Sequence, residues 1–442
     1  MNGLRTLFAA CGLFLFLRGE GDCATTHYTN SLDRDVIQEY IDNIADDGDT
    51  IILPSGVSTW DSGVVVPGLK GLIISGAGID ETVITAPQAF LINGQEGRFF
   101  RLSGLTFRGE GEPKIKVAGT AKAWRIDNIK FEMGNNSAIT VDGYTYGVID
   151  NCRFVGTRPD ACISVFENSG ETGGADSWNR PLTLGTGDAV YVEECEFRFD
   201  TFSGGVGSID SRSGGRYVFR YNHVKNQIIG HHDACATSQR GTFSWEVYGN
   251  TFEYTEPLAA AIMMRGGTGV IYNNRFSGQF STGGGSGTPL AMTSYRSWSV
   301  ECQTPWSPPC DFVREHMCDN GENNCVSDED CRPGVFCVQI DGHLDESGYP
   351  CRDQLGRTFD ADGDGIQDPA PAYEWNNTKV AGDLEYDWFI YGEGLVGMHI
   401  QEGRDYYTDE RMHDYTPYPF PHPLRITDSL APPSNLRIRR LR

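Results

Sequence analysis

The sequence predicts an all-β fold in which one chain winds into a single-stranded solenoid, a parallel β-helix. A short motif of alternating apolar residues recurs at 189–197, 216–224, 244–252 and 268–276. Each copy is too short to fold alone, so the copies must cover one another. The repeat period is close to 24 residues and is rich in β-branched residues, aromatic residues and glycine, which favours a β-helix over a helical repeat or a leucine-rich horseshoe.

The repeat extends over more of the chain as two apolar columns separated by a bend. One column lies after the bend and comprises Phe107, Phe131, Phe154, Phe197, Val224, Phe252 and Phe276. The other lies before the bend and comprises Ile126, Ile149, Val192, Phe219, Val247 and Ile271. We expect Asn222, Asn250 and Asn274 to form a structural ladder just after the bend, because asparagine tolerates left-handed backbone and can bond to neighbouring coils. In the same column Cys152 and Cys195 are expected to form either a disulfide or a stacked pair of thiols.

The N-terminal residues 1–24 have the pattern of a signal peptide. The apolar run 7–17 is too short to cross a bilayer, and a polar stretch with a plausible cleavage site near Ala24 follows it. A lipoprotein cleavage box at Cys11 is the alternative, but the apolar run continues past this cysteine. We therefore expect a secreted or cell-surface protein without membrane insertion. The β-helix itself is expected over 31–300, beginning with a capping helix at 31–44.

The charge and the cysteine content restrict the partners and the compartment. The chain has 60 acidic and 36 basic residues, a formal net charge of −24 that argues against nucleic-acid binding. Seven of the 13 cysteines lie between Cys302 and Cys351, within a stretch rich in proline, glycine and asparagine. We expect 301–358 to be an insertion held by disulfides in an oxidising compartment. Zinc is the alternative, although this stretch lacks a Cys-x-x-Cys pair.

Several motifs together resemble those of right-handed parallel β-helix proteins of the pectate lyase-like superfamily. They are Gly-Asp-Thr-Ile-Ile-Leu-Pro-Ser-Gly at 48–56, Gly-Ala-Gly at 76–78, the Asn-x-x-Phe coils and Gly-Gly-Thr-Gly at 266–269. The resemblance implies a right-handed coil and a polysaccharide partner, but it does not specify the reaction, because the superfamily contains lyases, hydrolases, esterases, tailspikes and adhesins. The sequence lacks the Arg-x-Pro-x-x-Arg of pectate lyases, and Gly230-His-His232 stands in place of the Gly-His-Gly of polygalacturonases.

The segment 359–370 resembles the calcium loop of thrombospondin type 3 and dockerin-like repeats. The expected ligands are the carboxylates of Asp360, Asp362, Asp364 and Asp368 and the backbone carbonyl of Ile366. Ca²⁺ is thus the expected cofactor, with a structural role, and a solvated acidic turn is the alternative. The remaining chain is expected to pack along the β-helix over 371–428 and to end in a linker and basic tail at 429–442.

Candidate functional residues lie where the coils differ from one another, at their turns. We expect catalytic roles for His231, His232, Arg240 and Arg265, and substrate-binding roles for Asp210, Arg212, Asp233, Tyr248 and Tyr272. The arginines occupy similar places on consecutive coils, so their charges need either a bound anion or neighbouring carboxylates such as Asp210, Asp233 or Glu246. A metal site at His-His-Asp is less favoured, because adjacent histidines in a strand point to opposite faces.

These residues suit β-elimination on a uronate-containing polysaccharide. This reaction needs a cation beside the sugar carboxylate, a base for the C5 proton and an acid for the leaving oxygen. Arginine or calcium can supply the cation and histidine the base, while Tyr221, Tyr248, Tyr254 and Tyr272 are open alternatives for the acid. A glycoside hydrolase with paired carboxylates and a non-catalytic carbohydrate-binding protein remain the other two hypotheses.

Overall fold

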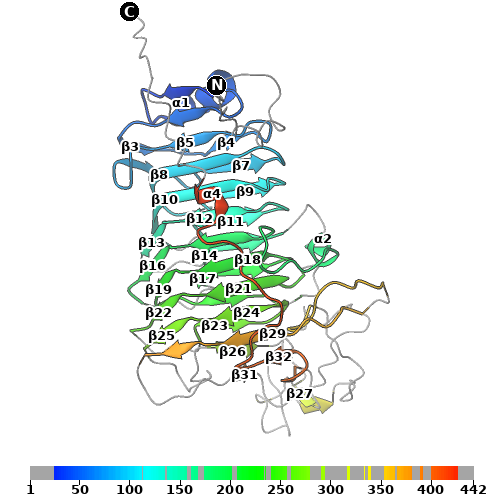
Figure 1. Cartoon of the computed structure of the whole chain (residues 1–442). Coiled ribbons are helices and arrows are strands. Elements are labelled where there is room, and N and C mark those ends of the chain that lie inside the picture. The colour runs from blue at the N-terminus through cyan, green and yellow to red at the C-terminus, as the bar shows by residue number, and fades with distance from the viewer. Residues whose placement is uncertain are drawn as a thin grey trace, which may run out of the picture.

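The strands of this protein pair in parallel with the equivalent strands of the next coil, and the coils follow one another along one axis (Figure 1). This arrangement confirms the predicted β-solenoid. The computed structural model describes residues 24–111, 113–134, 137–156, 161–167, 174–201, 207–232, 234, 240–255, 260–278, 290–293, 316–318, 333, 337–339, 353–363, 366–380, 389–391 and 400–426. In this part of the chain, a 20-stranded sheet, sheet A, and a 10-stranded sheet, sheet B, make up the coil. No described helix is long and apolar enough to span a membrane.

In sheet A the chain bends once in each coil, so the sheet has one arm before the bend and one arm after it. The arm before the bend contains β1 (Thr26–Tyr28), β2 (Thr50–Ile52), β5 (Ile73–Ser75), the first parts of β8 (Phe100–Arg108) and β10 (Trp124–Met133), β12 (Gly147–Asp150), β15 (Val190–Glu193), β18 (Arg216–Arg220), β21 (Ser244–Tyr248), β24 (Thr268–Tyr272), β29 (Ala372–Trp375) and β32 (Tyr406–Tyr407). The arm after the bend contains β3 (Gly56–Thr59), β6 (Thr82–Thr85), the second parts of β8 and β10, β13 (Arg153–Gly156), β16 (Glu196–Phe199), β19 (His223–Lys225), β22 (Thr251–Glu253), β25 (Arg275–Ser277) and β30 (Thr378–Lys379).

Sheet B closes the coil opposite sheet A. Its strands are β4 (Val64–Val66), β7 (Phe90–Gly94), β9 (Ile115–Gly119), β11 (Ile139–Asp142), β14 (Ala161–Phe166), β17 (Gly207–Arg212), β20 (Ile229–His231), β23 (Ile262–Met264), β26 (Leu290–Thr293) and β31 (Phe389–Tyr391). Outside the coil, β27 (His316–Cys318) and β28 (Cys337–Gln339) pair antiparallel, and α2 (Ala175–Trp178) and α4 (Pro423–Ile426) are short helices.

The bend in sheet A has a backbone cause. The bend predicted between the two columns falls at residues that all have φ between 50° and 71°, namely Gly104, Asn128, Asn151, Glu194, Tyr221, Gly249 and Asn273. This left-handed backbone reverses the inward and outward alternation, so apolar residues on both sides of the bend point into the core. The register confirms both predicted columns: Phe131 pairs with Phe154, and Ile126 pairs with Ile149.

The predicted asparagine ladder follows this bend. Asn222 Nδ2 donates to Asn250 Oδ1 at 3.1 Å, and Asn250 Nδ2 donates to Asn274 Oδ1 at 2.9 Å. The ladder continues to Asn377, whose Oδ1 accepts from Asn274 Nδ2 at 2.9 Å. Each buried amide therefore satisfies groups on the coils above and below it, which supports the structural interpretation.

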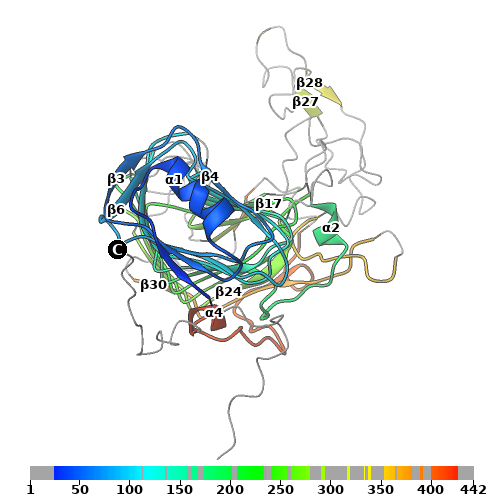
Figure 2. The same ribbon diagram turned by 90° about the horizontal axis from the view of Figure 1, so that it is seen from above.

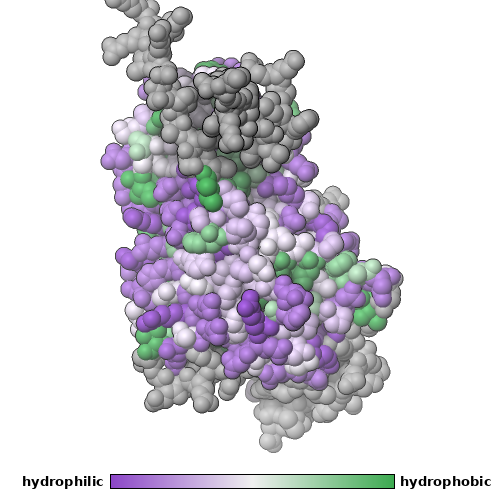
Figure 3. Space-filling model, in the orientation of Figure 1, coloured by the Kyte–Doolittle hydropathy of each residue, from purple (hydrophilic) through white to green (hydrophobic). Residues whose placement is uncertain are grey.

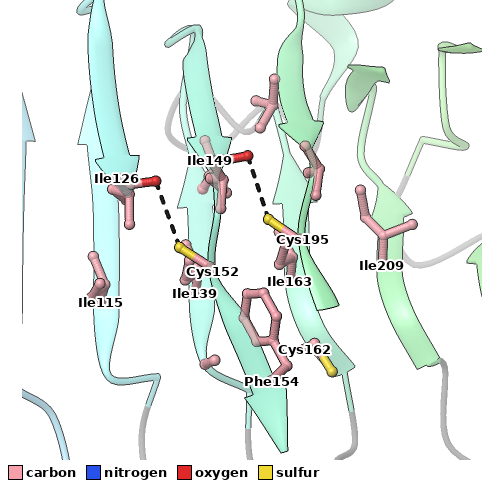
Figure 4. Packing of buried hydrophobic residues seen from close by; sticks show 14 of the residues in the cluster. Ile115, Ile126, Ile139, Ile149, Cys152, Phe154, Cys162, Ile163, Cys195 and Ile209 are labelled. Carbon is pink, nitrogen blue, oxygen red and sulfur yellow. Dashed lines mark hydrogen bonds between the residues drawn. The ribbon is translucent and has the colours of Figure 1, made fainter. Parts of the chain in front are cut away.

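Cys152 and Cys195 occupy the same column as the asparagines, and they are stacked thiols rather than a disulfide (Figure 4). The Cys152 thiol donates to Ile126 O and the Cys195 thiol donates to Ile149 O, each at 3.7 Å. Burial raises the pKa of Cys152 well above its ordinary value. These two thiols and that of Cys162 are buried and free. The expected disulfides of the cysteine-rich stretch involve side chains outside the described residues.

The predicted capping helix covers the N-terminal end of the coil (Figure 2). It consists of α1 (Arg34–Glu39) followed by a π-helical turn, η1 (Tyr40–Ile44). Ile37 and Ile41 are fully buried, whereas Ile44, which regular α-helical spacing would place on the same face, is 41% exposed. The wider π turn has more residues per turn than an α-helix, so it moves Ile44 away from the buried stripe.

The solenoid continues beyond the expected boundary at residue 300. After the cysteine-rich stretch, β29 pairs with β24, β30 pairs with β25, and β31 pairs with β26. The chain then crosses the outer face of sheet A to reach α4 (Figure 1). There Arg425 forms ion pairs with Glu193 at 2.8 Å and with Asp150 at 3.1 Å. The 371–428 segment therefore contributes both further coils and a cover over sheet A, on a face that is largely hydrophilic (Figure 3).

Candidate functional site

The outer face of sheet B brings together several of the predicted site residues. In β17, Ile209 and Ser211 point into the coil, so Asp210 and Arg212 alternate to the outside. Asp210 pairs in register with Gly230, and Ser211 pairs with His231. The same alternation places His231 inside and His232 outside, as expected for adjacent histidines in a strand. Asp210, Arg212 and His232 therefore share one outer face on two neighbouring coils.

His232 and Asp210 form a close pair on this face. His232 Nε2 lies 2.8 Å from Asp210 Oδ1, and the two side chains are only 12% and 8% exposed. The backbone N–H of His232 donates to Ser211 O at 2.9 Å, which ties the residue to the preceding coil. A carboxylate beside one ring nitrogen favours a proton on that nitrogen. The pair thus has the chemistry of an oriented general base.

Cationic side chains flank this pair. The Arg212 guanidinium lies over the Phe166 ring, with Cζ 4.4 Å from its centroid, and among the described residues it has no ion pair. Gly230 of β20 pairs with Met263 of β23, and extending this register by two residues places Arg265 beside His232 on the next coil. Arg265 is partly buried, and its charge contributes to the lowered pKa of His231. The face therefore carries a carboxylate-bound histidine between two arginines.

His231 has a different environment. Its Nε2 bonds to the hydroxyl of Tyr217, its ring stacks on Trp245 with centroids 5.4 Å apart, and it is 1% exposed. Burial, with smaller contributions from His232 and Arg265, lowers the pKa of His231 to about 3. A neutral histidine inside the coil cannot reach a substrate on the outer face. His231 is therefore a core residue, and the predicted catalytic role is left to His232.

The Arg240 side chain is bound to a carboxylate other than Asp210. Its Nε and Nη2 donate to the two carboxylate oxygens of Asp353 at 2.8 and 2.7 Å. Asp353 is fully buried and also accepts from the backbone N–H of Gly241 at 2.8 Å. The carboxylate partner predicted for the arginines exists, but it comes from the cysteine-rich stretch. Its distance in sequence, 113 residues, hid it from pattern analysis.

The predicted tyrosines lie on other surfaces. Tyr248 and Tyr272 belong to β21 and β24 of sheet A, and Tyr221 follows β18 at the bend. The Tyr254 hydroxyl is buried and donates to Gln227 O at 2.7 Å. None of the four lies on the outer face of sheet B, so none is placed to act with His232. Asp233 lies outside the described residues.

A second polar cluster at the turns from sheet B to sheet A was missed by sequence reasoning. Lys122 Nζ lies 2.7 Å from the Tyr144 ring centroid and 4.0 Å from that of Tyr146, with no hydrogen-bond partner in the described chain. Burial lowers the pKa of Lys122 to about 7, although Glu167 opposes this effect. Glu167 Oε1 accepts a hydrogen bond from the Tyr146 hydroxyl, and Glu167 Oε2 lies 3.5 Å from Arg216 Nε. The sequence signal that could have revealed this cluster is that its residues occupy the same turn on successive coils.

The calcium-type loop has ligands of the right kind, but they do not converge in the described part. Asp360 Oδ1 accepts from Gly363 N at 2.7 Å, and Asp368 Oδ2 accepts from Ala361 N at 3.1 Å. Hard oxygen donors match the preference of Ca²⁺. However, no three His, Cys, Asp or Glu side chains of the described residues are grouped to hold a metal, and Asp364 lies outside these residues.

Comparison with known proteins adds no assignment. No family model matches the sequence, and no curated protein is significantly similar to it.

Proposed function

We propose that this protein is a secreted polysaccharide lyase that cleaves a uronate-containing glycan on the outer face of β17 and β20. The observation that carries the proposal is the 2.8 Å contact of His232 with Asp210, beside Arg212 and next to the coil that holds Arg265. The β-solenoid is a scaffold common among polysaccharide-active proteins, and the N-terminal signal-peptide pattern supports export.

The residues of this face match the needs of β-elimination. Arg212 and Arg265 would bind the uronate carboxylate and stabilise the negative charge that develops when C5 loses its proton. His232, oriented by Asp210, would accept that proton. The C5–H electron pair then forms the C4–C5 double bond as the C4–O bond breaks. Because no tyrosine candidate lies on this face, we assign delivery of the proton to the leaving oxygen to the same His232 imidazolium.

A panel of polysaccharides tests the reaction class. We expect the mature protein to raise the ultraviolet absorbance of at least one uronate-containing polymer, since only elimination creates a conjugated double bond. Release of reducing ends without this absorbance would indicate a hydrolase, which needs a second carboxylate about 5 to 10 Å from Asp210. Binding without either signal would indicate a non-catalytic carbohydrate-binding protein. Each of these two results would overturn the lyase proposal.

A further inference from the structure

A second pocket lies on sheet A, away from the His232 face. It has a volume of about 400 Å³ and opens between the end of the solenoid and the segment that crosses sheet A. Its aromatic lining is Tyr272, Trp375 and Tyr415. A volume of this size falls within the range of roughly 300–1,000 Å³ that is usual for small-molecule sites.

The aromatic lining is the end of a stacked ladder. Tyr248 and Tyr272 stack with centroids 4.6 Å apart, and Tyr272 and Trp375 stack at 4.4 Å with an interplanar angle of 3°. The next strand, β32, pairs with β29 at Ala372 and Tyr373, so the register places Asp409 beyond Trp375 instead of another ring. Tyr415 meets Trp375 edge-on, at 71°, and bonds through its hydroxyl to the buried Glu246. The pocket thus has a rigid aromatic floor and side wall, to which each of the three rings contributes the 6–8% of its surface that remains exposed.

The rim of the pocket is polar and has no net charge. It is formed by the exposed residues Asn273, Asn376, Asp409 and Arg411. Among the described residues, none of these four side chains has a hydrogen bond or ion pair, so their amide, carboxylate and guanidinium groups face solvent. One carboxylate and one guanidinium balance each other, in contrast to the arginines of the His232 face.

We propose that this pocket binds an uncharged pyranose unit of a glycan. The faces of sugar rings carry apolar C–H groups that pack on aromatic side chains, while their hydroxyls need donors and acceptors at the edge. The exposed parts of Tyr272, Trp375 and Tyr415 supply the first and the four rim residues supply the second. The site lies on a different sheet from His232 and its rim carries no net charge, so it would hold a neutral chain or side chain. The inference does not depend on catalysis at His232.

Binding of neutral oligosaccharides tests this inference. Calorimetry and saturation-transfer NMR would use gluco-, manno-, xylo- and galacto-hexaoses at up to about 10 mM. We expect saturable binding of at least one, with the strongest transfer to protons on one face of the sugar ring. Arg411→Ala and Asn376→Ala should each weaken binding by about five-fold, the effect of one lost hydrogen bond. Arg411 is exposed, so its substitution should leave folding unaffected. Asn376 has a left-handed φ of 54°, which alanine tolerates less well than asparagine, so the melting temperature of Asn376→Ala is measured beside its binding.

Matched controls separate this site from the proposed lyase site. Arg275→Ala and Asn43→Ala remove exposed side chains elsewhere and should leave binding unchanged. His232→Ala should also leave it unchanged, even if elimination is lost. Absence of binding by all four hexaoses, or binding that is insensitive to both rim substitutions, would overturn the inference while leaving the lyase proposal standing.

Discussion

His232 Nε2 lies 2.8 Å from Asp210 Oδ1, across two coils that are adjacent in space but 22 residues apart in sequence. The pair exists because β17 and β20 are in parallel register, which aligns their outward positions. A carboxylate at this distance favours one tautomer and one orientation of the imidazole, both of which help a general base.

Asp210→Asn should slow elimination by at least about ten-fold, because the amide no longer fixes the imidazole tautomer or stabilises the imidazolium. The substitution keeps the size of the side chain, so the melting temperature should change little. Steady-state rates on the best polymer of the panel, across a range of pH, provide the measurement. Unchanged rates and pH profile would mean that Asp210 does not act on His232.

Asp353→Ala should destabilise the fold by about 3–5 kcal/mol, because it leaves the nearly buried Arg240 without its partner. Urea unfolding measures this effect. Arg198→Ala breaks an exposed ion pair with Glu196 and is the control, with an expected loss below about 1 kcal/mol. Preserved stability together with lost elimination would instead show that Arg240 serves the reaction directly.

Stability should fall between about pH 6.5 and pH 3, where the unfolded chain protonates His231 but the native state, with a His231 pKa of about 3, does not. Because the lowered pKa disfavours the charged form, the stability is fully present above pH 6.5 and is lost as the pH falls. His422, whose pKa is likewise lowered to about 3 by burial, adds to the same slope.

Urea unfolding of His231→Gln at several pH values checks this account. In the variant, the free energy of unfolding should depend less on pH, and the part due to His231 corresponds to about 5 kcal/mol. His413→Gln, which changes an exposed histidine, should keep the wild-type slope. An equal slope in all three proteins would show that His231 is not buried in its neutral form.

Asn250→Ala should cost about 3 kcal/mol, because the backbone N–H of Asn222 and the carbonyl of Phe219 both lose their partner inside the coil. The free energy of unfolding measures this loss, with the exposed Asn43→Ala as control. A loss no larger than that of the control would show that the ladder contributes little to stability.

Ca²⁺ should bind to the 359–370 loop and raise the melting temperature, and a chelator should reverse the effect. Asp360→Ala and Asp362→Ala should each abolish the heat of binding in calorimetry, whereas Glu410→Ala, which removes another exposed carboxylate, should not. A titration without heat, and without any change in melting temperature, would favour the solvated acidic turn.

The fold was predictable from the sequence because it depends on local, repeated signals. The apolar columns, the bend positions and the asparagine ladder each recur once per coil, and all three have the predicted register. The continuation of the coil through β29 and Asn377 was missed, since the cysteine-rich stretch interrupts the period.

The candidate site was less predictable because contacts between unlike residues leave no periodic signal. Alternation in a strand does separate His231 from His232, but only the folded chain shows that His232 contacts Asp210. The partner of Arg240 lies in another region of the chain, and Lys122 owes its environment to rings from the next coil. Such contacts follow from how the turns pack.

The role of His232 as the general base is tested most directly by the rate at which the His232→Ala variant forms double bonds in a polymer that the wild-type protein cleaves. We expect a loss between about 10²- and 10⁴-fold, the usual contribution of a general base. His223→Ala, which removes a histidine from the other side of the coil, should retain the wild-type rate. A His232→Ala variant that forms the double bond at the wild-type rate would show that His232 is not the general base.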